Sequence, residues 1–457
     1  MIATAIGALL SILLPLAAGS AIVSSLWPGS PRILQIAMGT GIGLGLAGAT
    51  WTSALMISGS TVRSLIASES LLLILTTVLV LRRLRGSQNA LIEKTSQTAR
   101  GAEVAAVVLV VLFGLCTAAF LTDVSPHGGY DATAIWNSRA RFFYLSERPL
   151  NVLPYLVSPD YPVVLPGLIA RGWQYSRTNT VIVPIFLALF FTAASVLVLT
   201  SGLRLIVSRS TALLAGCMAL GTPFFLDAGV SQYADIAMCF FITSSTVLLS
   251  IADATESGAM GLPLLAGLSA GFAAATKNEG NLFVLAMVLA QLCLLFWNRR
   301  WKADGIRLVR FLIGLVPGLL ALAAFKAKSP MPNVLFSNMT LKTIVSAIGD
   351  EHRHFSVLKG FGRDLLFFGD WWINPLFFMI LYAILLRIAQ PGKRFSRHWQ
   401  FPAAVLVIMI CGYYGVYLFS PYPLDWHIQS SLPRLLVQLW PTALALWALV
   451  VTRKAAA

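Results

Sequence analysis

Charge is scarce in this sequence of 457 residues, and the charge that is present is mostly positive. Asp, Glu, Lys and Arg make up 11% of the chain, whereas hydrophobic residues make up 57%. This ratio, with a mean hydropathy of +0.79, excludes an ordinary soluble domain. The net charge of +15 is divided among short loops, which argues against nucleic acid as a partner. The composition indicates a membrane protein that contacts lipid.

Cysteine, strand patterning and metal-ligand motifs are also nearly absent. The 5 Cys fall inside apolar stretches without paired spacing, so neither a disulfide framework nor a zinc site is expected. No segment alternates apolar and polar residues in the way a sheet requires. The HRH triplet at 352–354 lacks two histidines at helical i, i+4 spacing and makes a poor metal site. We expect no required cofactor; a divalent cation is possible, but no motif supports one.

Long apolar runs are abundant, and they predict an all-α, multi-pass membrane protein. Crossing about 30 Å of hydrocarbon takes roughly 20 apolar residues in a helix, and about 13 runs approach that length. The first run lacks a basic start and a cleavage signature, so we expect a retained helix. The predicted spans are 4–26, 33–57, 64–81, 103–122, 180–201, 211–228, 234–252, 260–276, 280–297, 308–327, 374–390, 401–420 and 435–452.

The basic residues orient these spans. Three tight clusters, RRLR at 82–85, NRRWK at 298–302 and GKRFSR at 392–397, fall on one side, which the positive-inside rule makes cytoplasmic. The opposite side then carries the loops 123–178, 328–373 and 421–434. The first two of these loops contain amphipathic stretches that we expect to form helices at the interface. The sequence predicts an integral membrane protein, with its site facing the periplasm or the cell exterior of a bacterial inner or plasma membrane.

Three regions follow from this arrangement. Residues 1–100 hold three spans and a polar linker without charged residues clustered outside, which is typical of an accessory bundle. Residues 101–298 carry the first outside loop and form the expected core. Residues 299–457 carry the other two outside loops.

The first outside loop contains the segment GYDATAIWNSRARFFY. Two glycines end the preceding span, and Asp131 follows where a helix cap would lie. Asp131 is therefore either a cap or a base placed beside Arg139 and Arg141, which lie two to three turns further on. The position three residues after Asp131 is Ala134, which does not complete a capping box.

The same loop continues into SPDYPVVLPG. Prolines on both sides of Asp160 and Tyr161 predict an extended, stiff backbone. This turn is either a rigid re-entry whose Asp160 caps the next helix, or part of a binding pocket; the two functions are compatible.

Three further corners carry ionisable residues at the outer end of the bundle. Asp235 lies in QYADIAMCFF, Lys277 and Glu279 lie in TKNEGNLF, and His427 and Arg434 lie in DWHIQSSLPRLLVQLWP. Each has an ordinary alternative: a helix cap, a mutually compensating pair, a solvated histidine or an interfacial anchor. All of them map to one side of the membrane, which favours a shared site.

An Asp in the first outside loop, an aromatic and basic helix after it, and then a DYP turn resemble the GT-C superfamily of membrane glycosyltransferases. The loop looks most like that of the dolichyl-phosphate-glucose-dependent glucosyltransferases, and it is also similar to bacterial protein-mannosyltransferase and aminoarabinose-transferase proteins. The resemblance covers roughly residues 103–441. It implies a GT-C-like helical bundle, with Asp131 as the catalytic base. Many members have a paired acidic motif here, whereas this chain has Ala132, which puts a metal-binding role in doubt.

The resemblance implies an inverting transfer of a sugar from a polyprenyl-phosphate donor to a lipid-linked or glycan acceptor. Such chemistry needs a base for the acceptor hydroxyl and cations for the phosphate leaving group. The predicted donor-phosphate ligands are Lys277, Arg434, Arg139 and His427, and the predicted sugar or acceptor pocket comprises Asp160, Tyr161, Asp235, Glu279 and Trp136. A transporter or flippase for a lipid-linked anionic glycan, and a non-catalytic scaffold subunit, remain the alternatives.

Overall fold

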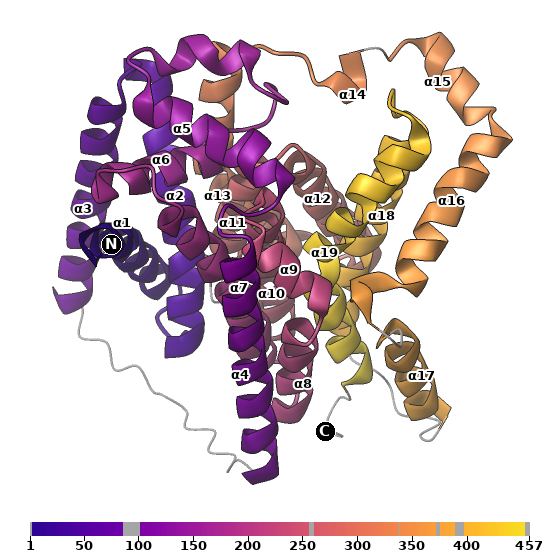
Figure 1. Cartoon of the computed structure of the whole chain (residues 1–457). Coiled ribbons are helices and arrows are strands. Elements are labelled where there is room, and N and C mark those ends of the chain that lie inside the picture. The colour runs from indigo at the N-terminus through magenta and orange to yellow at the C-terminus, as the bar shows by residue number, and fades with distance from the viewer. Residues whose placement is uncertain are drawn as a thin grey trace.

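Every regular element in the described part of the chain is a helix. The computed structural model describes residues 2–85, 101–255, 260–337, 339–371, 375–388 and 397–452. The polar linker at 86–100 and most of the basic segment at 392–397 lie outside these residues. Long helices form one bundle, and shorter helices lie at its upper end in Figure 1. The all-α, multi-pass fold predicted from the sequence is confirmed.

Within the described residues, ten helices are long and apolar enough to cross a membrane. Each one corresponds to a predicted span, although several helices extend beyond it. They are α1 (Ile2–Leu26), α2 (Arg32–Ser58), α3 (Thr61–Arg85), α4 (Gly101–Val124), α7 (Ile182–Leu203), α10 (Ala234–Ala254), α12 (Glu279–Asn298), α13 (Trp301–Lys328), α18 (Gln400–Leu418) and α19 (Leu424–Val451).

Three of the predicted spans differ from a single long helix. The span at 211–228 is two helices, α8 (Arg209–Leu220) and α9 (Pro223–Val230), bent by 63°. A proline at the first position of α9 cannot continue the α8 hydrogen-bond pattern, which explains the break. The span at 260–276 is α11 (Gly261–Thr276), shorter than a full crossing, and the span at 374–390 is α17 (Pro375–Ile388). The described residues thus give ten spans, or up to 12 if each of two bent pairs counts as one, instead of about 13.

Short helices occupy both long loops, as predicted. The first loop forms the π-helix η1 (Ala132–Trp136), α5 (Asn137–Leu145), the 3-10 helix η2 (Pro149–Tyr155) and α6 (Val164–Ser176). The second forms α14 (Val334–Ser337), α15 (Leu341–Ile348), α16 (Glu351–Leu366) and the turn η3 (Phe368–Asp370), and η4 (Arg397–Trp399) precedes α18. Helix α15 has no buried residue, in keeping with a helix that lies at an interface.

The centre of the bundle is α10, whose hydrophobic stretch is entirely buried. Helix α2 packs beside it against α1, α6, α7 and α13. Its glycines permit this closeness: a Cβ on Gly43 would lie 1.8 Å from the carbonyl oxygen of Pro15 in α1. The helices of the predicted accessory region are therefore built into the bundle.

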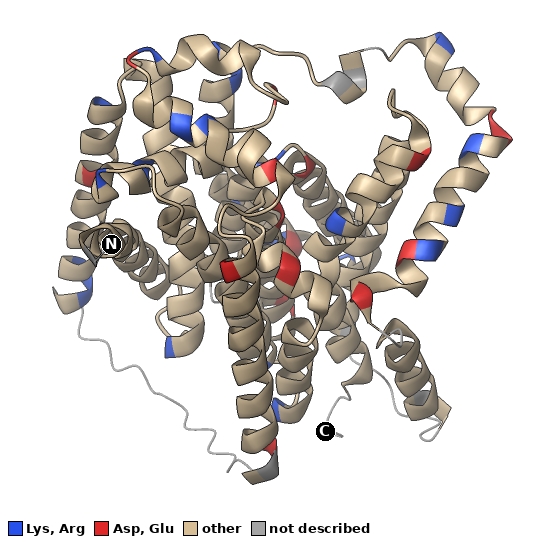
Figure 2. Ribbon diagram, viewed as in Figure 1, with Lys and Arg blue, Asp and Glu red and all other residues tan. Residues whose placement is uncertain are grey.

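Charged residues are sparse along the long helices and gather toward the loops (Figure 2). Helix α4 presents nearly all of its surface outward, with only 6% of its apolar stretch buried. Such an apolar, unburied helix is what a lipid-facing position requires. Inside the bundle, in contrast, one group of acidic and basic residues lies where α10, α12 and α19 meet the first loop.

Candidate active site

Asp131 is placed by a sharp turn and an unusual helix. Gly128 has a φ of +72° and its amide donates to the carbonyl of Ser125, closing the turn after α4. The π-helix η1 begins directly after Asp131. The carboxylate of Asp131 makes no hydrogen bond that caps this helix. The capping alternative is therefore excluded. Single π-turns of this kind are frequent at functional sites.

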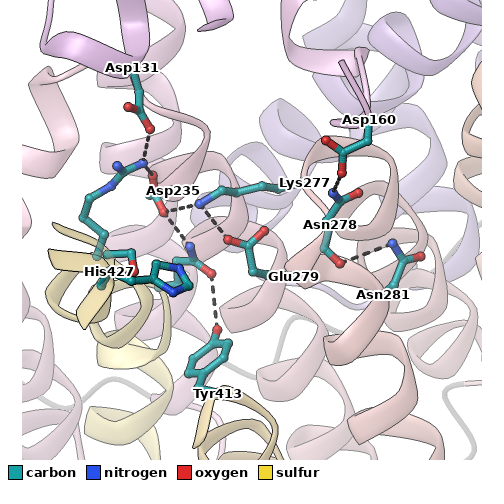
Figure 3. Close-up of polar contacts among 12 residues, drawn as sticks. Asp131, Asp160, Asp235, Lys277, Asn278, Glu279, Asn281, Tyr413 and His427 are labelled. Atoms are coloured by element: carbon teal, nitrogen blue, oxygen red, sulfur yellow. Dashed lines mark hydrogen bonds and ion pairs between the residues drawn. The ribbon is translucent and has the colours of Figure 1, made fainter. Parts of the chain in front are cut away.

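Asp131 instead pairs with Arg434 across more than 300 positions of sequence. One nitrogen of Arg434, Nη2, lies 2.7 Å from Oδ2 of Asp131 and 2.7 Å from Oδ2 of Asp235 (Figure 3). The ring of Tyr233 faces the guanidinium, with 4.4 Å between Cζ and the ring centroid. Arg434 thus holds together the first loop and α10, and it is more than an interfacial anchor.

The ion pairs continue from Asp235 to the turn between α11 and α12. The ammonium of Lys277 lies 3.0 Å from Oδ1 of Asp235 and 2.9 Å from Oε1 of Glu279. Burial alone would lower the pKa of Lys277, but Asp235 and Glu279 outweigh burial and raise it. Lys277 therefore stays charged at neutral pH. It does not snorkel to water, because only 4% of the residue is exposed.

We name these five residues the charge network: Asp131, Arg434, Asp235, Lys277 and Glu279. Their charges alternate along the chain of contacts, and the network carries one negative charge more than it carries positive charges. Two buried atoms in it have no hydrogen-bond partner in the described structure, Nε of Arg434 and Oε2 of Glu279. Buried polar atoms normally find partners, so these two are the unsatisfied atoms of the network.

Two residues that the sequence analysis missed complete the network. Gln438, one helical turn after Arg434 on α19, donates from Nε2 to Oδ1 of Asp235 at 2.5 Å. The hydroxyl of Tyr413 on α18 donates to Oε1 of Gln438 at 3.4 Å. The i, i+4 spacing from Arg434 to Gln438 was a usable signal, because an amide within an apolar span needs a polar neighbour.

Arg139 binds the DYP turn and not, as the sequence had predicted, the donor phosphate. Its guanidinium donates to the carbonyls of Tyr161, Val157 and Ser158, and the side chain is fully buried. Burial lowers the pKa of Arg139 to about 10, which still leaves it charged at neutral pH. The predicted role as a donor-phosphate ligand is replaced by one that fixes the DYP turn.

The DYP turn is held from three sides. The carboxylate of Asp160 accepts from Nδ2 of Asn278 at 2.6 Å, and its carbonyl accepts from Nζ of Lys326 at 2.5 Å. Asp160 does not cap α6, whose N-cap is Val163. Because Asn278 separates Lys277 from Glu279 in sequence, the turn is fastened to the charge network through this residue (Figure 3).

Two aromatic residues of the first loop stack on each other at the DYP turn. The rings of Trp136 and Tyr161 stack with centroids 5.7 Å apart and planes 18° apart. Trp136 is fully buried, so it supports Tyr161 from behind and does not line a pocket as predicted. Burial also raises the pKa of Tyr161, which keeps its hydroxyl neutral.

His427 lies near the charge network but is not bonded to it. Its Nδ1 lies 2.7 Å from the hydroxyl of Ser420, and its ring packs against Tyr417 and Tyr422. It shares one face of α19 with Arg434, seven residues further on, or ~10 Å along the helix. In this position His427 does not form a phosphate-binding site together with Arg434 and Lys277.

A cavity opens beside the network. It has a volume of about 240 Å³ and is lined by Asp235, Arg434, Tyr233 and Asp227, with serines and Gln429 around them. Its polar side chains suit a hydroxylated ligand, and Arg434 is the one cation among the described residues that line it. Among the described residues no group of His, Cys, Asp and Glu has the arrangement of a metal site.

Comparison with known proteins bears on part of the chain. Residues 161–329 match the family model described as dolichyl-phosphate-mannose-protein mannosyltransferase, a family with the GT-C fold. The match spans less than half of the chain. It contains Tyr161, Asp235, Lys277 and Glu279 but neither Asp131 nor Arg434. No curated protein and no solved structure matches the chain. The family match confirms the resemblance to the GT-C superfamily, and it supports a multi-pass membrane glycosyltransferase that uses a polyprenyl-phosphate sugar donor.

Proposed function

We propose that this protein transfers a sugar, with inversion, from a polyprenyl phosphate to a lipid-linked or glycan acceptor, and that Asp131 is the general base. The observation that carries the proposal is the pairing of Asp131 with Arg434 at 2.7 Å beside a cavity of about 240 Å³. Arg434 lines this cavity and Asp131 is bonded to Arg434; a base and a cation are the two groups that the chemistry requires.

The reaction is a single displacement. Asp131 accepts the proton of the acceptor hydroxyl as its oxygen attacks the anomeric carbon. The bond between that carbon and the phosphate oxygen breaks, and the electron pair leaves with the polyprenyl phosphate. The attack comes from the face opposite the phosphate, so the anomeric configuration inverts. Negative charge moves from the acceptor side to the phosphate, where Arg434 and Lys277 stabilise it.

The unpartnered atoms of the network support this division of roles. Nε of Arg434 is buried and unbonded, and it is a donor for a phosphate oxygen. Oε2 of Glu279 is buried and unbonded as well, and it is an acceptor for a sugar hydroxyl. Asp160 and Tyr161 belong to a turn fixed by Arg139 and Asn278, which suits the positioning of the sugar or the acceptor.

The charge distribution supports an outward-facing site. The tight basic cluster at Arg82 and Arg83, and the one at Arg299 and Arg300, lie at the ends of α3 and α12 that are remote from the first loop. With those ends in the cytoplasm, the charge network faces the periplasm or the cell exterior. Two cations already serve the phosphate, so the proposed reaction requires no metal ion.

The test is Asp131→Asn in the purified, full-length protein. We expect the transfer rate from polyprenyl-phosphate sugars to fall by about a hundredfold or more, because the amide cannot accept the proton. Donor affinity should be kept or improved, since one carboxylate that competes for Arg434 has been neutralised. Asp123→Asn, an exposed carboxylate at the end of α4, is the matched control and should behave as the native protein.

The measurements are initial transfer rates with labelled donor and a separate titration of donor binding. Loss of transfer with donor binding retained supports the glycosyltransferase. Unchanged transfer in Asp131→Asn excludes this residue as the base. Movement of the lipid-linked anion across a vesicle membrane, without transfer and without dependence on Asp131, indicates a transporter.

A further inference from the structure

A second cavity lies beside the helices that follow Asp131. Its volume is about 450 Å³, and it is lined by residues of η1 and α5 and by the segment that joins α6 to α7. Thr133 and Asn137 line it from η1 and α5, whereas Thr180 and Val181 line it at the start of α7. It is therefore separate from the cavity at Arg434.

The charge of this second cavity has one sign. Arg141 and His127 line it, and no Asp or Glu does. Arg139, Arg171 and Arg434 have their guanidinium groups engaged by several acceptors. Arg141, in contrast, makes no ion pair with a described carboxylate. In the orientation of Asn179 that satisfies both side chains, Arg141 donates to it from Nε at 3.0 Å and Nη2 at 3.2 Å. Arg141 is exposed and lines the cavity, where an anion is the complementary ligand.

One neutral side chain that lines the cavity, Asn137, has an oxygen atom that lacks a hydrogen-bond donor. Asn137 donates from Nδ2 to Gln232 at 2.9 Å, while its buried Oδ1 has no partner in the described structure. A sugar hydroxyl satisfies such an oxygen. Trp173 offers an aromatic wall, and its indole nitrogen is already bonded to the carbonyl of Thr180 at 2.7 Å. An anion joined to a sugar fits these requirements together.

The cavity lies next to the start of a membrane span, and this position favours a ligand that is attached to a lipid. Thr180 and Val181 immediately precede α7, a helix long enough to cross the membrane. Residues at the start of a span lie at the level of lipid phosphates. The first backbone N–H groups of α7 add partial positive charge at the same level.

We propose that this cavity binds the phosphate and first sugar of a lipid-linked acceptor. The inference rests on the proposed function, since an acceptor presupposes a transferase. His127 and Thr133 lie four residues before and two residues after Asp131 in the chain. In this proposal a glycan whose phosphate is bound at Arg141 extends past Thr133 toward Asp131, and the two cavities serve acceptor and donor separately.

The test measures binding without catalysis, so that its failure and the failure of the proposed function are distinct. The full-length protein in phosphatidylcholine nanodiscs is titrated with a synthetic polyprenyl diphosphate that carries one sugar. Arg141→Gln should weaken binding about tenfold or more, since a charge-assisted contact is lost. Arg141→Lys should keep part of the affinity. Arg148→Gln, exposed in the same loop, is the matched control and should bind as the native protein does.

Three comparisons decide the identity of the ligand. A neutral glycolipid with the same sugar should bind weakly, and phosphatidylglycerol should compete poorly. Equal binding of the neutral lipid, or equal competition by phosphatidylglycerol, overturns the acceptor assignment. So does a loss of polyprenyl-monophosphate sugar binding in Arg141→Gln, because that places the donor here. If no donor supports transfer and Arg141→Gln still loses diphosphate binding, the assignment of a lipid-phosphate site to this cavity stands, and its acceptor role fails together with the proposed reaction.

Discussion

At the scale of single residues, the central feature is one nitrogen shared by two carboxylates. Nη2 of Arg434 bonds both Asp131 and Asp235 at 2.7 Å. In the proposed reaction, a donor phosphate that binds Arg434 competes with Asp131 for that nitrogen. Donor binding then frees the Asp131 carboxylate from this contact, so that it can meet the acceptor hydroxyl.

Asp235 should matter more for the folded state than for proton transfer. It is fully buried and bonds Arg434, Lys277 and Gln438. Asp235→Asn leaves the buried Lys277 and the partly buried Arg434 undercompensated, and breaking one side of a buried ion pair costs about 3–5 kcal/mol. We expect a clearly lower Tm in detergent together with loss of transfer. Asp425→Asn, exposed in the first turn of α19, is the control; an Asp235→Asn protein as stable as that control contradicts the role.

The residue types of the site were predictable from the sequence, but most of their partners were not. Ionisable residues at the outer ends of apolar spans pointed to Asp131, Asp235, Lys277, Glu279 and Arg434, because such residues are costly at a membrane boundary. The contact between Asp131 and Arg434 depends on how the last span packs against the first loop. No local pattern encodes that distance. Arg139 was misassigned for the same reason, since its backbone partners lie 18 to 22 residues away.

At the scale of elements, apolar length predicted the position of every span in the described residues, and the main error lies where a helix bends. Hydropathy alone cannot show that Pro223 begins a new helix after α8. The end of α11 at Thr276, in contrast, coincides with the end of the predicted span 260–276. The amphipathic helices in both loops were predictable from composition. The π-turn that follows Asp131 was not, because it depends on tertiary contacts.

Helix α2 offers a test of close packing. Gly43→Ala introduces a methyl group 1.8 Å from the carbonyl oxygen of Pro15, so α1 and α2 must move apart. Overpacking of this kind costs about 1–3 kcal/mol. We expect a Tm several degrees below that of Gly29→Ala, whose added methyl group meets nothing within 4 Å. Equal thermal stability of the two variants in detergent refutes the contact.

At the scale of the whole molecule, the first three helices belong to the folded unit. Glu69 on α3 forms a two-point ion pair with the buried Arg171 on α6, at 2.6 and 2.9 Å. Tyr175 donates to the same carboxylate at 2.7 Å, and Arg171 also donates to the carbonyl of Ser11 on α1. These contacts join α1, α3 and α6, beneath the loop that carries Asp131.

Deletion of residues 1–85 should therefore prevent folding, because it removes the partners of α6, α7 and α13 and leaves Arg171 buried without its carboxylate. A chain cut between α3 and α4 and produced as two pieces should associate instead, since the contacts are noncovalent. Size-exclusion chromatography in detergent with a tag on one piece measures both outcomes. A monodisperse, thermally stable protein that lacks residues 1–85 rules out this structural role.

The alternating signs of the charge network restrict how related sequences can diverge. Loss of Asp235, Lys277 or Arg434 leaves a charged neighbour without a partner in a buried or partly buried environment, so tolerated changes at these positions should occur in compensating sets. A homologue without Lys277 is expected to lack the acid at position 279, and one that changes Arg434 is expected to alter both aspartates it joins. Covariation among these positions would record the electrostatics of the site over evolutionary time, independently of which sugar is transferred.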